Sequence, residues 1–93
     1  MSRTTQGNRR PDNLPLKELA AGDYSKRIWP NGDIEWYIRD PAGRGGAIGQ
    51  RGPGSNHEVS EHEDGTITVS PSILDPRPGG WHGFLERGIW REC

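Results

Sequence analysis

The sequence predicts a mainly β fold, a small antiparallel barrel or sandwich built from three hairpins, with one short N-terminal helix. A five-residue pattern with glycine in fourth place occurs three times, as WPNGD (29–33), HEDGT (62–66) and LERGI (85–89). Such a glycine suits the left-handed residue of a three-residue hairpin loop. In addition, 14 glycines and 8 prolines among 93 residues favour turns over long helices. With only 29% hydrophobic residues, the core must depend on the tryptophans and other aromatic rings.

The N-terminal part is expected to contain little regular structure. Residues 1–13 are polar and basic and have no apolar periodicity, which predicts a disordered basic arm. The segment LPLKELAAG (14–22) then has Leu16, Leu19 and Ala20 at helical spacing, with Pro15 at the start and Gly22 at the end. It predicts a helix of about two turns. Residues 14–93 are therefore expected to form one small β-rich domain.

Turn type fixes strand register, and register fixes which side chains share a face. In the first hairpin, Trp29 is expected opposite Asp33 and Ile28 opposite Ile34. The resulting core stripe comprises Ile28, Ile34, Trp36 and Ile38, with Glu35 and Tyr37 on the other face.

The same argument applies to the other two hairpins. In the second, Glu61 is expected opposite Ile67, and Val59, Ile67 and Val69 are expected to share the inner face. In the third, Leu85 is expected opposite Ile89 and Phe84 opposite Trp90. Both faces of the third hairpin are apolar, which predicts a central position in the sheet.

Two segments between the hairpins are expected to be irregular. A Gly-rich loop spans residues 42–55, and its glycines match no phosphate-binding spacing. It is interpreted as a flexible or ligand-ordered loop, or alternatively as a nucleic-acid segment that uses Arg44 and Arg51 with Tyr37 as a stacking surface. SPSILDPRPGG (70–80) contains three prolines and predicts a rigid connection with Ile73 and Leu74 in the core.

The stretch NHEVSEHEDG (56–65) resembles a zinc-protease motif but has the wrong spacing. Five positions separate His57 from His62, so the two rings would lie apart on a helix and on opposite faces of a strand. Folding could still bring His57, His82 and Cys93 together, although no two of them have the short spacing typical of zinc ligands. We therefore expect no enzyme activity, no cofactor and no metal.

Charge is distributed unevenly along the chain, although the net charge is only −1. Residues 1–55 contain nine Lys and Arg against six Asp and Glu, whereas residues 56–93 contain three against seven. The second hairpin contributes a cluster of four acids, Glu58, Glu61, Glu63 and Asp64. This acidic hairpin is the predicted partner-binding surface, and an ordinary solvated hairpin is the alternative interpretation.

Other features bear on where the chain acts. The single cysteine, Cys93, excludes an internal disulfide framework and is typical of a reducing compartment. The first residues lack the apolar region of a signal peptide, and no later stretch approaches the ~20 apolar residues of a membrane span. We expect a cytoplasmic protein that contacts no membrane.

Weak self-association through a sheet edge or a Trp face is also expected, because the predicted core is small.

The C-terminal half resembles a family of small uncharacterised phage and prophage proteins, a domain of unknown function. The resemblance rests on HEVSEHEDGTITVSPSI and WHGFLERGIW and covers His57 to Trp90. The matching residues are Asp64, Gly65, Ser70, Pro71, Ser72, Ile73, Trp81, His82, Gly83 and Trp90. Some members of the family have metal-binding cysteines that this chain lacks. The resemblance implies a phage or mobile-element origin, life inside a bacterium, and no established activity.

These observations favour a non-enzymatic phage-derived binding protein, in one version an inhibitor of a host defence complex such as a CRISPR effector. Its partner would be a host or phage protein complex. One alternative is a nucleic-acid-binding accessory protein that uses the basic arm and the Arg/Gly loop, through Arg3, Arg9, Arg10, Arg44 and Arg51, with Tyr37 or Trp29 as stacking surfaces. The other is a phage structural or self-assembly protein.

Overall fold

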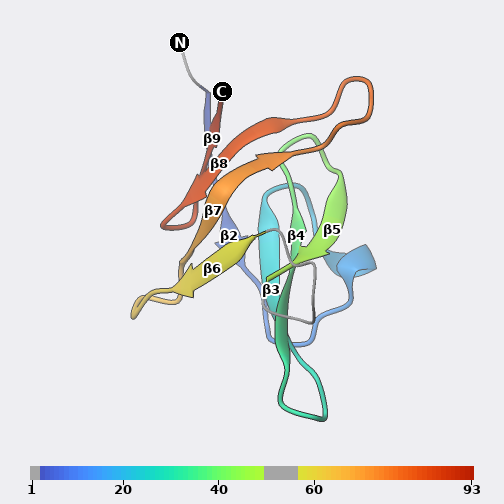
Figure 1. Ribbon diagram of the computed structural model, residues 1–93, viewed down its shortest axis with the longest axis vertical. Coiled ribbons are helices and arrows are strands. Elements are labelled where there is room, and N and C mark those ends of the chain that lie inside the picture. Colours follow the sequence, from blue (N-terminus) through green and yellow to red (C-terminus); the bar gives the residue numbers. More distant parts are fainter. Residues whose placement is uncertain (1–2, 50–56) are drawn as a thin grey trace.

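The computed structural model describes residues 3–49 and 57–93, which form two β-sheets packed face to face (Figure 1). One sheet has five strands in the order β1-β9-β8-β7-β6, and the other has four in the order β2-β3-β4-β5. The strands are β1 Thr4–Gln6, β2 Asn8–Arg9, β3 Asp23–Ile28, β4 Ile34–Arg39, β5 Gly45–Ile48, β6 Glu58–Glu61, β7 Ile67–Leu74, β8 His82–Glu86 and β9 Ile89–Glu92. The mainly β prediction is confirmed, and of the two architectures the sandwich is the one formed, since the described strands do not close into a barrel.

The N-terminal segment is ordered where the structure describes it, so the prediction of a disordered arm over 1–13 is wrong for these residues. β1 pairs antiparallel with β9, and β2 pairs parallel with β3. Gly7 lies between them, and its N–H donates to the carbonyl oxygen of Gly88 at 2.8 Å. The side chains of β1 are exposed while its backbone completes a sheet edge. Such pairing requires no apolar pattern, which is why the sequence did not indicate it.

The expected two-turn helix is also corrected. Only a 3₁₀ turn, η1 (Leu16–Glu18), forms, and Leu19 is already extended at φ −80° and ψ 139°. Extension turns the side chain of Leu19 into the protein, where it is 5% exposed. Gly22 then adopts φ +88° and donates its N–H to the carbonyl oxygen of Arg39, which starts β3. Packing against β4 therefore overrides the helical spacing of the apolar residues.

The first hairpin has the predicted register, with Ile28 opposite Ile34 and the Trp29 N–H bonded to the Asp33 carbonyl oxygen. Its core stripe is shorter than predicted. Trp36 is buried, and so is Ile38, but Ile28 and Ile34 are 42% and 36% exposed. The hairpin projects beyond the facing sheet, so the described strands of that sheet do not extend over its tip (Figure 1).

The second hairpin is confirmed: Glu61 lies opposite Ile67, and Ile67 and Val69 are buried on the inner face. In the third hairpin the predicted register is wrong by one residue, because Leu85 lies opposite Trp90 and not Ile89. Arg87 and Gly88 both have positive φ, 46° and 76°, as a two-residue type I′ turn requires. The central placement is confirmed, since β8 is the middle strand of its sheet.

Both segments expected to be irregular contain strands. Within the described part of the Gly-rich loop, β5 pairs with β4. The Pro-rich segment continues β7 to Leu74, and the register with β8 shifts between Val69 and Ile73, around Pro71. Pro71, which follows a cis peptide bond, has no N–H to donate to a ladder, and such a bulge accommodates it. Ile73 is buried as predicted, whereas Leu74 is 59% exposed.

The core lies between the two sheets and is rich in aromatic rings. Trp81 meets Trp90 edge to face, with ring centroids 5.4 Å apart. The buried cluster comprises Tyr24, Trp36, Ile38, Ile67, Val69, Ile73, Trp81, Leu85 and Trp90, with Ile48 and Val59 packed against it. Three tryptophans and a tyrosine thus supply much of a small core, as the composition indicated.

Candidate functional site

The acidic hairpin formed by β6 and β7 has a well-defined turn. The N–H of His62 donates to the carbonyl oxygen of Thr66 at 2.8 Å, and Gly65 takes the left-handed conformation at φ +87°. Asp64 Oδ1 accepts hydrogen bonds from the backbone N–H of Thr66 at 3.0 Å and from its hydroxyl at 2.6 Å. These bonds stabilise the carboxylate and lower the pKa of Asp64. The turn is therefore built by the same residues that carry its charge.

The four predicted acids do not play equal parts. Glu58, Glu63 and Asp64 are exposed, and within the described residues none of them is in an ion pair. Glu61 is different: one carboxylate oxygen accepts from Lys26 Nζ at 2.8 Å and the other from Arg9 Nη1 at 2.7 Å. The hydrogen bond from Lys26, followed by that from Arg9, holds the pKa of Glu61 below its usual value. Three acids are thus presented to solvent without an ion pair in the described structure, and Glu61, whose side chain is 37% exposed, is an anchor to the other sheet.

The anchor connects the hairpin to the other sheet. Arg9 also donates to the carbonyl oxygen of Gly65 at 2.9 Å, directly at the turn. The guanidinium of Arg9 and the ammonium of Lys26 lie 5.1 Å and 5.9 Å from the ring centroid of Trp36. Burial of Arg9 opposes its charge, but the hydrogen bonds to Glu61 and Asp12 outweigh it and raise the pKa of Arg9. A buried indole, two cations and one carboxylate therefore fix the orientation of the hairpin.

The tip of the hairpin borders an open polar cavity of about 440 Å³ lined by Glu61, His62, Glu63, Asp64 and Arg87. The ring of His62 also contacts the neighbouring strand, where its Nε2 lies 2.7 Å from Thr68 Oγ1. The same hydroxyl accepts the N–H of Arg87 at 3.0 Å. The described residues that line the cavity contribute three carboxylates, one imidazole and one guanidinium.

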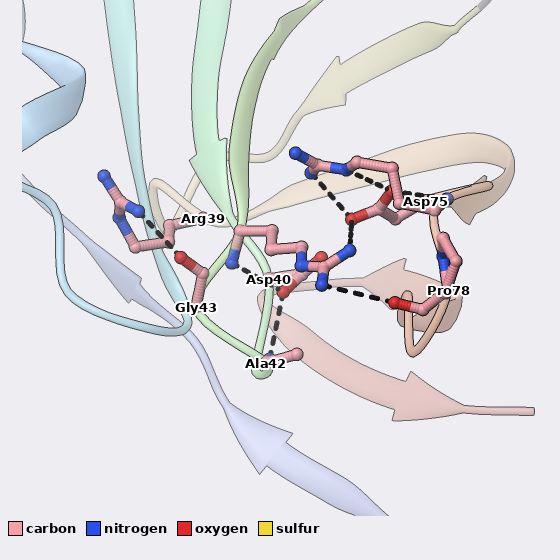
Figure 2. A network of polar contacts seen from close by, with 8 residues as sticks. Arg39, Asp40, Ala42, Gly43, Asp75 and Pro78 are labelled. Atoms are coloured by element: carbon pink, nitrogen blue, oxygen red, sulfur yellow. Dashed lines mark hydrogen bonds and ion pairs between the residues drawn. The ribbon is translucent and has the colours of Figure 1, made fainter.

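The structure describes two of the three residues predicted as secondary contacts, Tyr37 and Arg44. Tyr37 is half-buried in the middle of β4, opposite Ser25 and Ala47. Arg44 is bound to Asp75 at 3.1 Å and to the carbonyl oxygen of Pro78 at 3.3 Å (Figure 2). Arg51 lies outside the described residues.

The other groups proposed for nucleic acid are likewise engaged within the chain. Arg10 Nη1 donates to the buried carboxylate of Asp23 at 2.9 Å. The ring of Trp29 lies under the guanidinium of Arg27 at 4.3 Å, and its N–H donates to Glu35 at 3.0 Å. Cationic and aromatic side chains of the four-stranded sheet therefore already have intramolecular partners.

A second polar network joins the β4–β5 turn to the segment after β7, and sequence reasoning did not foresee it (Figure 2). Asp40, 4% exposed, accepts the backbone N–H groups of Ala42 at 2.9 Å and Arg44 at 3.1 Å. Asp75 is shared by Arg44 and Arg77. The bidentate hydrogen bonds from Arg77, then that from Arg44, depress the pKa of Asp75 strongly. The only sequence signal was the pair of Asp residues, each starting a turn that contains proline.

His57 and His82 both contact Ser72, and the backbone of Cys93 is hydrogen-bonded to that of His82. His57 Nε2 is 3.2 Å from the carbonyl oxygen of Ser72, and His82 Nε2 is 3.2 Å from the hydroxyl of the same residue. The N–H of Cys93 donates to the carbonyl oxygen of His82 at 2.9 Å, and Cys93 is exposed. Among residues 3–49 and 57–93, no three His, Cys, Asp or Glu side chains are grouped to hold an ion.

Comparison of the chain with protein-family models, curated proteins and solved structures gives no significant match. The resemblance of the C-terminal half to phage and prophage proteins therefore stays a prediction. In the described part of the chain, no helix has the length and apolar character needed to cross a membrane.

Proposed function

We propose that this chain is a non-enzymatic binding protein that presents the acidic hairpin to a basic surface of a partner protein. The observation that carries the proposal is the double anchoring of Glu61 by Arg9 and Lys26. It fixes the hairpin against the other sheet, while Glu58, Glu63 and Asp64 stay exposed. A charged surface that is already ordered loses little entropy on association. Exposed charge of one sign also accelerates encounter with a surface of opposite charge.

The resemblance to phage proteins supports a more specific version of this proposal. A phage-derived protein in the cytoplasm of a bacterial host would act on a host or phage protein complex. A defence nuclease such as a CRISPR effector has a basic nucleic-acid groove, and an acidic hairpin is complementary to such a groove. Protein contact ranks ahead of nucleic acid in this proposal because Arg9, Arg10 and Arg44 are already paired with carboxylates. The phage structural role remains the alternative if no partner is found.

The proposal is tested by affinity capture of the tagged chain from nuclease-treated bacterial lysate, followed by binding measurements on the captured partner. The neutral hairpin variant combines Glu58→Gln, Glu63→Gln and Asp64→Asn, and the new amide at 64 retains an oxygen for the Thr66 N–H. A matched control with the same charge change elsewhere combines Glu18→Gln, Glu86→Gln and Glu92→Gln. We expect the hairpin variant to weaken binding at least about tenfold and the control to leave it nearly unchanged. Equal effects of the two variants, or full binding by the hairpin variant, would contradict the proposal.

A further inference from the structure

β5 forms one margin of the four-stranded sheet. Within the described residues it pairs only with β4, which leaves the backbone N–H and C=O groups along its other side without a strand partner (Figure 1). Such an edge is a template for adding a strand. β5 begins with Gly45 and Gly46, and glycines within a strand mark places where another backbone can approach closely.

Gly46 leaves a hole in the inner face of the sheet. It lies opposite Ile38, whose side chain is buried in the core, and a Cβ placed on Gly46 would meet no atom within 4 Å. A cavity of about 150 Å³ occupies this region. Its apolar walls come from both sheets: Ile38, Ile48, Ile73 and Leu74. An apolar cavity of about this size holds one benzene-sized group.

The cavity and the edge are geometrically linked. Side chains directly opposite each other on neighbouring strands lie on the same face, with Cβ atoms about 4.5–5.5 Å apart. Since Gly46 and Ile48 belong to the inner face, a residue of an added strand opposite either of them points its side chain toward the cavity. One extended segment could therefore use the β5 edge and fill the cavity with a single anchor side chain.

The rim of the cavity indicates the charge of the occupant. Arg44 and Arg77 share the single carboxylate of Asp75, so these three side chains together have one positive charge. Asp40 also lines the cavity and brings the sum of these four charges to zero, but it is 4% exposed and accepts two backbone N–H groups of its own turn, so the charge exposed at the rim is that of Arg77. Arg77 has 62% of its side chain exposed and can meet an incoming carboxylate. The rim thus favours an acidic residue beside the apolar anchor.

We propose that β5 is the docking edge for an extended segment of a partner protein, which adds a strand, inserts one aliphatic side chain into the cavity over Gly46 and places an acidic residue near Arg77. This mode, in which backbone hydrogen bonds give affinity and a side-chain pocket gives specificity, is β-strand addition. It goes beyond the acidic hairpin, because it uses a different surface with the opposite charge preference.

A displayed library of random nine-residue peptides provides the probe. Binders selected on the wild-type protein are expected to contain an aliphatic residue with an acidic residue within two positions, and to lack proline between them. Three variants are then measured with one selected peptide. Gly46→Leu fills the cavity from within, Ala47→Leu adds the same bulk on the opposite, exposed face of β5, and Arg77→Glu reverses the rim charge.

We expect Gly46→Leu to weaken binding of the peptide at least about thirtyfold, because the anchor side chain can no longer enter its pocket. Ala47→Leu should change the affinity for the peptide less than about threefold. Arg77→Glu should remove the preference for an acidic residue, and it keeps the test valid if Gly46→Leu fails to fold. Amides of residues 45–48 should exchange more slowly with peptide bound. Absence of enriched peptides, or equal binding by Gly46→Leu, would overturn the proposal. A wild-type dimer in sedimentation that Gly46→Leu dissolves would also overturn it, by assigning the edge to a second copy.

Discussion

The indole N–H of Trp90 donates a buried hydrogen bond of 2.9 Å to the carbonyl oxygen of Gly22. Trp90 belongs to β9 in one sheet, and Gly22 directly precedes β3 in the other. The contact therefore joins the two sheets through one polar interaction inside an apolar core. A buried donor or acceptor left without a partner costs about 1–3 kcal/mol, so this bond fixes how the sheets are placed.

Trp90→Phe should lower the free energy of unfolding by about 2–4 kcal/mol. The substitution removes the donor to Gly22 and leaves a partial cavity beside Trp81. Urea unfolding followed by far-UV circular dichroism measures the change. Trp29→Phe serves as the control, because Trp29 is only half-buried on the projecting first hairpin, and we expect a loss below about 1 kcal/mol. Similar losses for the two variants would contradict the structural role assigned to Trp90.

Gly7→Ala should destabilise the protein by about 2 kcal/mol or more, because the new Cβ would lie 2.6 Å from the backbone oxygen of Gly88. Either the crossing between β1 and β2 shifts or the turn after β8 moves. The measurement is thermal unfolding, together with amide exchange in residues 4–9. Gly46→Ala is the matched control: its Cβ meets nothing, and the change should stay within about 0.5 kcal/mol. If Gly7→Ala were as stable as the control, the N-terminal strands would not be packed as described.

Glu61→Gln should lower stability at neutral pH by about 0.5–1 kcal/mol, the range for partly exposed ion pairs. Glu61 has a pKa lowered in the folded state, so its contribution is complete above the unfolded value of 4.5 and disappears as the pH falls through the folded pKa. The difference between wild type and variant should therefore shrink below about pH 4.5. Urea unfolding at pH 7 and pH 3 tests this. The control is Glu58→Gln, at an exposed position without an ion pair in the described structure, which should change stability at pH 7 by less than about 0.5 kcal/mol.

Asp40→Ala should destabilise the β4–β5 turn and lower the free energy of unfolding by about 1–2 kcal/mol. The carboxylate accepts the N–H groups of Ala42 and Arg44, and both lose this acceptor in the variant. Faster amide exchange at residues 42 and 44 is the direct measurement. Asp40→Asn retains one side-chain oxygen and should recover part of the loss. Unchanged exchange in Asp40→Ala would show that the turn does not depend on this side chain.

Glycine placement predicted two of the three hairpins with their registers, because a left-handed residue at a fixed place in the loop determines which residues face each other. The third hairpin differs because Arg87, a residue without special preference for positive φ, occupies the first position of a two-residue turn. Its sequence pattern was compatible with both loop lengths. The β1 and β2 pairings were also invisible, because backbone atoms form the ladders and the side-chain contacts of Arg9 join residues far apart in the sequence.

The sequence predicted which acidic residues form the candidate site, but not which residues of the same chain pair with them. The sequence placed four acids on one hairpin, and the turn geometry followed from Asp64 and Gly65. Glu61 forms its ion pairs with Arg9 and Lys26, which are 52 and 35 residues away in the sequence. Contacts of that sequence separation are set by how the sheets cross, and single-sequence patterns do not encode that crossing.

The pairing of β1 with β9 brings the two ends of the described chain side by side, with the Glu92 N–H bonded to the Arg3 carbonyl oxygen at 2.8 Å (Figure 1). Closing the chain there with a short linker would leave both sheets intact. New ends could be opened at Gly32, which lies in the exposed tip of the first hairpin with free space around it. Such a circular permutant would make β4 and β5 first and β2 and β3 last, so the four-stranded sheet would be completed after the five-stranded sheet instead of before it. It would separate the contribution of synthesis order to folding from that of the final contacts.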